Sequence, residues 1–341
     1  MKKLLLLSLS TLTFGATASL AACVGDSPVN PVGTDSGNNN MPDTSTTPDT
    51  STPTDAGSDA PAPACDLTKP FGVLSPITEL NDTSSNGGSA HPTTDLLTVF
   101  LGTDRPAGDL KIKLFKATRA HATDPWSAPA LMPNLSGSVG TFFWYTDAEM
   151  TSDGKTLYYT VGAPFAQQIY KSTRTDVTMD FPAGAPENAL RPADPGDAGA
   201  IAGFTIYLLP DDATMYYSAG DLKNPDLYVA KLTSSGWSTP TPLTAINSTQ
   251  VEQYVAVTPD ELTIYFGSSR DTGDPRYHKI YKATRASTSD PFGNLAAVAE
   301  LNSGTATVDQ GPSYISPDGC TIWITNTTTG KNQIYTATKP K

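Results

Sequence analysis

The chain has 341 residues, of which 34 are acidic and 22 are basic, so its formal charge is −12. This balance argues against nucleic acid or an anionic lipid surface as a partner, because both require clustered Lys and Arg. The 27 Gly and 29 Pro residues indicate a chain rich in turns. With only three Cys, the chain can form at most one internal disulfide.

The first 22 residues have the pattern of a bacterial export signal. Lys2 and Lys3 precede an apolar stretch that is too short and too rich in Ser and Thr to span a bilayer. The next feature is Leu20-Ala21-Ala22-Cys23, which resembles the lipobox of bacterial lipoproteins. The resemblance implies a signal peptide over residues 1–22 and acylation of Cys23, with ordinary signal-peptidase cleavage as the alternative. By similarity to known sorting rules, Val24 favours the outer membrane.

Residues 23–64 have a different composition from the rest of the chain. After Cys23 this segment contains no Leu, Ile, Phe, Tyr or Trp, and Pro, Ser, Thr and Asp dominate it. Such a segment buries too little apolar surface to offset the entropy of ordering. We therefore expect a disordered linker between the lipidated Cys23 and a folded domain over residues 65–341.

A short motif recurs five times in residues 65–341. An aspartate is followed three residues later by Thr, four later by an aliphatic residue and five later by an aromatic ring, with anchors at Asp95, Asp153, Asp211, Asp260 and Asp318. A period of roughly 50 to 58 residues is typical of propeller blades and other repeat arrays. We expect each anchor aspartate to cap its own turn.

Each repeat predicts four short strands. The first strand ends near the anchor aspartate, a tight turn such as Ser316-Pro317-Asp318-Gly319 follows, and the second strand carries the Thr-aliphatic-aromatic triplet. The third strand ends in Arg or Lys in four copies, whereas the copy around Tyr228 continues as Lys231-Leu232. Aromatic residues mark four outer strands: Trp126, Phe181, Trp237 and Phe292.

Five sets of inner strands require a fifth outer strand, and the start of the domain supplies it. Pro70-Phe71-Gly72 and Glu79-Leu80-Asn81 match Pro291-Phe292-Gly293 and Glu300-Leu301-Asn302. We therefore predict an all-β, five-bladed β-propeller of four-stranded antiparallel blades. Its last blade is closed by residues 71–80 beside Tyr335, which removes exposed sheet edges.

The two cysteines of this domain fit the predicted closure. Cys65 precedes the outer strand of the shared blade and Cys320 opens the second strand of the same blade. In an exported chain oxidation is expected, and the two strand starts lie at the same end of the sheet. The prediction is a Cys65–Cys320 disulfide, with two unpaired thiols as the alternative.

One stretch carries a family resemblance. Gly236-Trp237-Ser238-Thr239-Pro240 leads through Thr258-Pro259-Asp260 to Ile264-Tyr265-Phe266-Gly267, and it resembles the WD-type, TolB-like propeller repeat of bacterial envelope proteins. Members of that family scaffold envelope complexes, bind peptides or glycans, or accompany catalytic domains. TolB itself carries six blades and an extra N-terminal domain, whereas this chain predicts five blades and a linker.

Candidate functional residues lie where loops meet the central channel of a propeller, at the start of the first strands and between the second and third strands. Three carboxylates there, Asp197, Glu252 and Asp309, would suit a glycan-active, glycosidase-like enzyme. The other candidate ligand-binding residues are Gln253, Gln310, Asp104, Arg105, Arg270, Tyr277 and His278.

The preferred functional prediction is a non-catalytic binding or scaffolding module, because no nucleophile or phosphate-loop motif is present. His91, His121 and His278 show no metal-ligand spacing, so we expect no metal and no cofactor. We expect a monomeric propeller, anchored to the outer membrane by its lipid, with an envelope protein or polysaccharide as partner.

Overall fold

The computed structural model describes residues 65–106, 111–137, 144–163, 166–192, 205–220, 224–302, 305, 307–327 and 330–341. The predicted signal peptide, Cys23, the linker and Asp197 lie outside these residues. Within the described part of the chain, no helix is long and apolar enough to cross a membrane.

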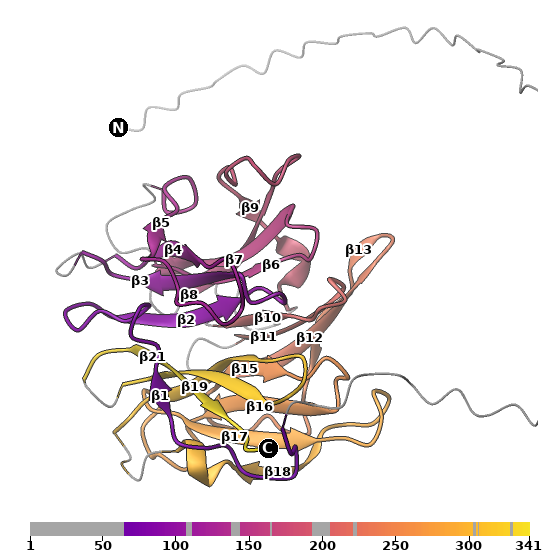
Figure 1. The fold of residues 1–341 in the computed structure, drawn as a ribbon. Helices are drawn as coiled ribbons and strands as arrows, with labels where there is room; N and C mark the ends of the chain where they lie inside the picture. The colour runs from indigo at the N-terminus through magenta and orange to yellow at the C-terminus, as the bar shows by residue number, and fades with distance from the viewer. Residues whose placement is uncertain are drawn as a thin grey trace, which may run out of the picture. The chain divides into compact units, whose positions relative to one another are not determined.

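Five antiparallel sheets follow one another along the chain (Figure 1). Each of the first four blades is built in the order of the sequence, from the channel outward. The strands of the first two are β2 (Gly87–Pro92), β3 (Thr98–Thr103), β4 (Lys113–Thr118) and β5 (Ala130–Leu131), then β6 (Trp144–Met150), β7 (Thr156–Ala163), β8 (Ala166–Thr173) and β9 (Ala185–Pro186).

The third blade differs from the other four at its outer edge. Its strands are β10 (Ile206–Leu208), β11 (Thr214–Gly220) and β12 (Pro225–Thr233), and two short strands, β13 (Gly236–Trp237) and β14 (Thr241–Pro242), both pair with β12. The predicted fourth strand is therefore divided in two here. The fourth blade contains β15 (Glu252–Val257), β16 (Thr263–Ser268), β17 (Lys279–Thr284) and β18 (Gly293–Ala297).

The last blade confirms the predicted closure. It consists of β19 (Gln310–Ile315), β20 (Thr321–Asn326), β21 (Gln333–Thr338) and the first strand of the domain, β1 (Ser75–Pro76). Ser75 pairs with Thr336 and Pro76 with Tyr335, so indigo β1 lies beside yellow β21 in Figure 1. The predicted five-bladed propeller is confirmed.

The side chain of Asn81 strengthens this junction. It donates to the carbonyl of Ile334 and accepts from the Ile334 N–H, at 2.9 and 2.8 Å. Asn302, its counterpart in the sequence match, makes the same two-way contact with Ile280 in the fourth blade. The match between the two sequence segments thus has a physical basis in how each chain segment binds the third strand.

The predicted disulfide is also present. Cys65 and Cys320 are bonded, with their Cα atoms 5.7 Å apart and 255 residues separating them in the sequence. Nearby, the Asp66 N–H donates to the carbonyl of Pro340. The two ends of the described chain are therefore joined by a covalent bond as well as by strand pairing.

The anchor aspartates cap their turns. Asp95 accepts from the Thr93 hydroxyl at 2.6 Å and from the Leu97 N–H at 2.9 Å. The same arrangement recurs at Asp153, Asp260 and Asp318. These aspartates stabilise hairpins and do not reach the channel mouth.

A second repeated contact holds the outer edge of four blades. The cation at the end of the third strand lies over the aromatic ring that precedes the outer strand, and we call this contact the outer clamp. Cation-to-centroid distances are 4.1 Å for Arg119 and Trp126, 4.2 Å for Arg174 and Phe181, 4.3 Å for Arg285 and Phe292, and 4.4 Å for Lys339 and Phe71. In the third blade Leu232 occupies the position of the cation, and Trp237 instead contacts Tyr158 edge-on.

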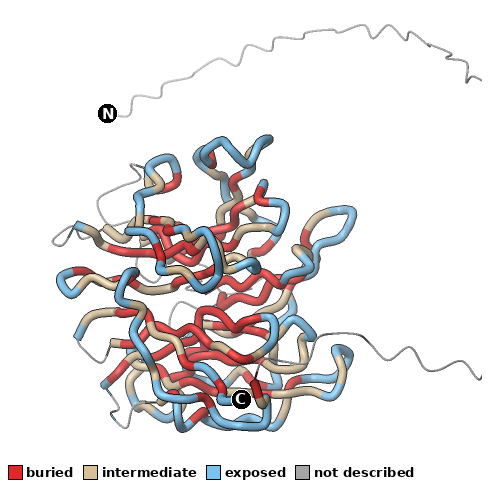
Figure 2. Tube along the Cα trace, viewed as in Figure 1, coloured by how far each residue is buried: buried red, intermediate tan, exposed pale blue. Residues whose placement is uncertain are grey.

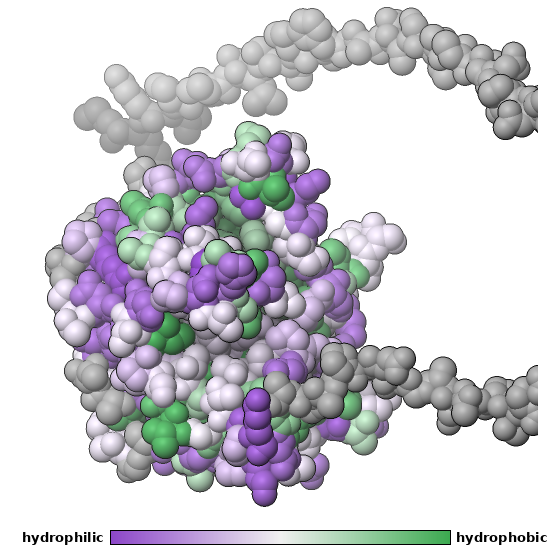
Figure 3. Space-filling view, viewed as in Figure 1, coloured by the Kyte–Doolittle hydropathy of each residue, from purple (hydrophilic) through white to green (hydrophobic). Residues whose placement is uncertain are grey.

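Burial is concentrated in the inner three strands of each blade (Figure 2). The aliphatic and aromatic members of the repeated triplets, such as Ile264 and Tyr265, pack between neighbouring blades, where β-branched and aromatic side chains fit a pleated surface. On the face shown in Figure 3, hydrophobic residues form small groups among hydrophilic ones.

Candidate functional site

The first strands of four blades carry a β-bulge, in β2, β6, β15 and β19. Three of these bulges contain a residue that is not glycine and has a positive φ: Ser89 at 50°, Asp147 at 47° and Tyr254 at 57°. Such a conformation costs on the order of 1 to 3 kcal/mol and is often found at functional sites. The bulges turn these side chains toward a common space.

That space is a cavity of about 80 Å³ at the end of the channel where the first strands begin. We call this end the channel mouth and the cavity the mouth hollow. Its lining comes from the first, second, fourth and fifth blades: Asn86, Gly88, Ser89, Gly102, Ile112, Trp144, Thr146, Asp147, Gln167, Tyr254 and Asn332.

Glycines allow the lining to approach closely. A Cβ atom on Gly311 would lie 2.1 Å from the ring of Tyr254, and one on Gly102 would lie 2.9 Å from the methyl group of Thr146. The Tyr254 ring, which reaches from β15 across to β19, is therefore seated on the bare backbone of the next blade. Any larger residue at Gly311 would displace it.

Below the mouth hollow, one imidazole binds two carboxylates. His91 Nδ1 lies 2.8 Å from Glu149 Oε1, and His91 Nε2 lies 3.4 Å from Asp147 Oδ1. The His91 side chain is fully buried. Burial alone lowers the pKa of His91, but the negative charges and hydrogen bonds of Glu149 and Asp147 outweigh it and raise the pKa to about 9. At neutral pH this histidine carries a proton.

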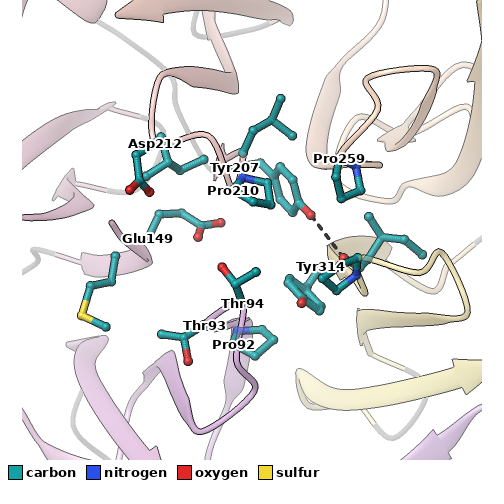
Figure 4. Close-up of a pocket in the computed structure, with 14 residues that line it drawn as sticks. Pro92, Thr93, Thr94, Glu149, Tyr207, Pro210, Asp212, Pro259 and Tyr314 are labelled. Atoms are coloured by element: carbon teal, nitrogen blue, oxygen red, sulfur yellow. Dashed lines mark hydrogen bonds between the residues drawn. The ribbon is translucent and has the colours of Figure 1, made fainter. Parts of the chain in front are cut away.

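The opposite end of the channel contains a second, smaller pocket (Figure 4). Glu149 extends into it between Tyr207 and Asp212, and the Leu208 N–H donates to the Glu149 carboxylate. Tyr207 donates to the carbonyl of Ile315 at 3.4 Å, whereas the buried hydroxyl of Tyr314 has no hydrogen-bond partner. Asp147 thus faces the mouth hollow, Glu149 faces this pocket, and His91 connects them.

A second histidine cluster lies beside the mouth hollow. Asp309 accepts from the Tyr254 hydroxyl at 2.9 Å and lies 2.7 Å from Nδ1 of His278. The Gln253 amide lies 3.0 Å from Nε2 of the same histidine. Burial, followed by the charge of Asp309, raises the pKa of Tyr254 far above its usual value, so this phenol stays neutral and donates.

Glu252 and Arg270, predicted as site residues, bind each other. Glu252 is fully buried and accepts from Ser248 at 2.7 Å, from Ser268 at 2.8 Å and from Arg270 at 3.0 Å. Arg270 also donates to the carbonyl of Ile246. This pair fixes a loop of the fourth blade and has little capacity left for a ligand.

The other predicted residues are dispersed. Asp104 accepts from the backbone and side chain of Asn86, Arg105 donates to the carbonyl of Leu80, and Gln310 donates to that of Leu301. Tyr277 is half-buried, 5.5 Å from the guanidinium of Arg276. Of the predicted residues that the structure describes, Gln253, His278 and Asp309 form a connected cluster of three, and Glu252 and Arg270 form a separate pair.

The channel residues that were not predicted include Asp147, Glu149, Gln167 and Tyr254. For Asp147 and Glu149 the sequence did offer a signal: they are two acidic residues in the otherwise uncharged stretch Trp144–Met150, and buried carboxylates need specific partners. Among the residues that the structure describes, no group of three His, Cys, Asp or Glu side chains has a geometry suited to a metal ion.

Comparisons with known proteins agree on the fold. No protein-family model matches the sequence, and no curated protein matches it. The α-L-arabinofuranosidase PaAbf62A from Podospora anserina is similar with a TM-score of 0.50 and 13% identity, over 81% of this chain and 98% of that one.

Two TolB structures are also similar. TolB from Acinetobacter baumannii has a TM-score of 0.40 and 16% identity over 71% of this chain, which spans 53% of that protein. A putative TolB from Agrobacterium tumefaciens has a TM-score of 0.44 and 16% identity, over 74% of this chain and 76% of that one. At these identities the comparisons concern the fold alone.

Proposed function

We propose that this chain is a lipid-anchored, non-catalytic binding or scaffolding propeller of the bacterial cell envelope. Its partner, a protein or a polysaccharide, contacts the channel mouth. The observation that supports this most directly is the mouth hollow, where polar side chains from several blades converge and the buried amide of Gln167 has a nitrogen without a partner.

The bonding of Glu252 and Asp309, the two predicted catalytic carboxylates that the structure describes, does not favour a glycosidase. A glycosidase needs one carboxyl group to deliver a proton to the substrate and another to reach water or the anomeric carbon. Glu252 is bound by two serines and Arg270, and Asp309 by Tyr254 and His278. Both carboxylates are held by internal donors, which is the arrangement of a structural group.

The lipid anchor and the outer-membrane location rest on the sequence of Leu20-Ala21-Ala22-Cys23 and on Val24. The substitution Cys23→Ala tests them directly. We expect the full chain to move from the membrane fraction to the soluble fraction of the envelope and to lose metabolically incorporated fatty acid. Retention in the membrane with no incorporated fatty acid in the unsubstituted protein would refute the anchor.

Site-specific crosslinking tests the binding face. A photoreactive amino acid at Asn332, which lines the mouth hollow, should capture a discrete partner in intact cells. The matched control is the same amino acid at Asp260, in a turn at the other end of the channel. Equal capture at both positions, or none at Asn332, would contradict binding at the mouth.

A further inference from the structure

The side-chain amide of Gln167 is fully buried and only half satisfied. Its oxygen accepts from the Thr146 hydroxyl at 3.4 Å, and its nitrogen has no partner. Turning the amide over would leave the oxygen unpaired instead. A buried polar group left without a hydrogen bond costs roughly 1 to 3 kcal/mol. Because Gln167 lines the mouth hollow, a ligand that accepts a hydrogen bond from its nitrogen would remove this cost.

Asp147 supplies an acceptor in the same cavity. Its two contacts are long, 3.4 Å to His91 and 3.3 Å from the Thr160 hydroxyl, which leaves capacity for a shorter bond. The ligand must therefore both donate and accept within one small space. An ammonium or guanidinium group has no acceptor, a carboxylate or phosphate ester has no donor, and a hydroxyl has both.

From this chemistry we propose that the mouth hollow binds one hydroxyl-rich saccharide unit. Adjacent hydroxyls would bond to Asp147 and Gln167, and the side chain of Ser89 lies in the same lining for a third contact. The rings of Trp144 and Tyr254, also in the lining, provide apolar walls for the C–H faces of a sugar ring.

A single amide group is the competing ligand, because it also donates and accepts. The polar groups of the lining come from several directions, namely Ser89 on β2, Asp147 on β6 and Gln167 on β8. A ring with hydroxyls around its edge satisfies all three, whereas one amide satisfies two. This inference rests on the proposed binding at the mouth and narrows its partner to a glycan.

The test uses the full-length protein in detergent and methyl glycosides of glucose, galactose, mannose and N-acetylglucosamine as probes. Binding is measured by saturation-transfer NMR and by tryptophan fluorescence. We expect at least one glycoside to bind and Gln167→Leu to weaken it at least tenfold. Because the substitution removes an unpaired buried amide, the urea midpoint should not fall.

Tyr314→Phe is the matched control. It also deletes a buried polar atom without a partner, but that atom lies in the pocket at the other end of the channel, so glycoside binding should not change. Ser89→Ala, in the same lining as Gln167, should weaken binding at least threefold and provides a second variant if Gln167→Leu does not fold.

Three results would overturn the saccharide proposal: no glycoside binds, Gln167→Leu binds as well as the unsubstituted protein, or N-acetylglutamine amide displaces the glycoside at equal concentration. Crosslinking from Asn332 to a protein would then still support binding at the mouth, so the narrower proposal can fail while the broader one stands.

Discussion

One imidazole between two carboxylates gives His91 a specific role in stability. Its protonated form neutralises one of the two buried charges, and removing that cation leaves the buried carboxylates of Asp147 and Glu149 without this positive partner. Breaking a buried ion pair in this way typically costs about 3 to 5 kcal/mol. The contact between His91 and the two carboxylates therefore depends on a proton that the folded protein binds more tightly than the unfolded chain does.

The pH dependence of stability follows from the direction in which the pKa of His91 is shifted. Because the pKa of His91 is raised from 6.5 to about 9, its contribution is complete below pH 6.5 and is lost as the pH rises through 9. The full contribution is about 3 kcal/mol. Burial also raises the pKa of Glu149, which again makes folding less favourable as the pH rises.

We therefore expect His91→Gln to lower the free energy of unfolding by about 3 kcal/mol at pH 6 and to differ little from the unsubstituted protein at pH 10. Urea titrations at both pH values measure this. His121→Gln is the control, since that ring is exposed beside Asp124 and its loss should have the same small effect throughout. A stability difference that stays constant with pH would show that His91 is neutral in the folded state.

At the level of the strand and its outer edge, the outer clamp explains why four of the five repeats end their third strand in Arg or Lys. Arg174 lies over Phe181 and also donates to the carbonyls of Gly154 and Met179, each at 2.7 Å. It thereby joins the turn after the first strand to the segment that leads into the outer strand. The third blade, with Leu232 at this position, shows that the fold tolerates the loss of one clamp.

Replacing Arg174 with Met should lower the free energy of unfolding by about 2 kcal/mol, since one cation–π contact and two charge-assisted hydrogen bonds are lost. In a double-mutant cycle with Phe181→Leu, the coupling should be about 1 kcal/mol. Lys116→Met, on β4 and half-exposed, is the control and should change stability little. Additive effects of the two substitutions would mean that the ring and the cation do not interact.

The repeated elements could be predicted from the sequence because every copy carries the same information. The anchor aspartates, the triplets and the match between Asn81 and Asn302 each recur, so the blades and the shared strand were predictable. The positions of the two cysteines in the shared blade then predicted the disulfide. Channel residues such as Asp147 and Gln167 occur once, without a period to reveal them.

The β-bulges are a second reason why the channel residues could not be predicted. A strand alternates its side chains between two faces, and one extra residue reverses which of them face the channel. Glu252 was predicted at the channel mouth from its place at the start of a first strand, whereas it binds Arg270 within the blade. Since the sequence carries no clear signal for the bulges at Ser89, Asp147 and Tyr254, the direction of these side chains could not be predicted.

At the scale of the whole molecule, the ring depends on a very short seam. β1 contributes two paired residues to the last blade, supported by the N–H groups of Gly72 and Ile77, which donate to Thr338 and Ile334. So few hydrogen bonds would open easily on their own. The Cys65–Cys320 bond holds the start of this segment next to the blade that it completes.

Replacing both cysteines with Ser should therefore destabilise the seam first and then the fold. Loop-entropy estimates for a bond that closes 255 residues give about 5 kcal/mol. Hydrogen exchange should accelerate at Gly72 and Ile77 more than at the amides of β16, which lies in a blade closed without the chain end. Reducing the unsubstituted protein should reproduce both effects, and the double variant should not respond to reductant. Unchanged exchange at Gly72 and Ile77 would mean that strand pairing and the Asn81 contacts close the ring without the disulfide.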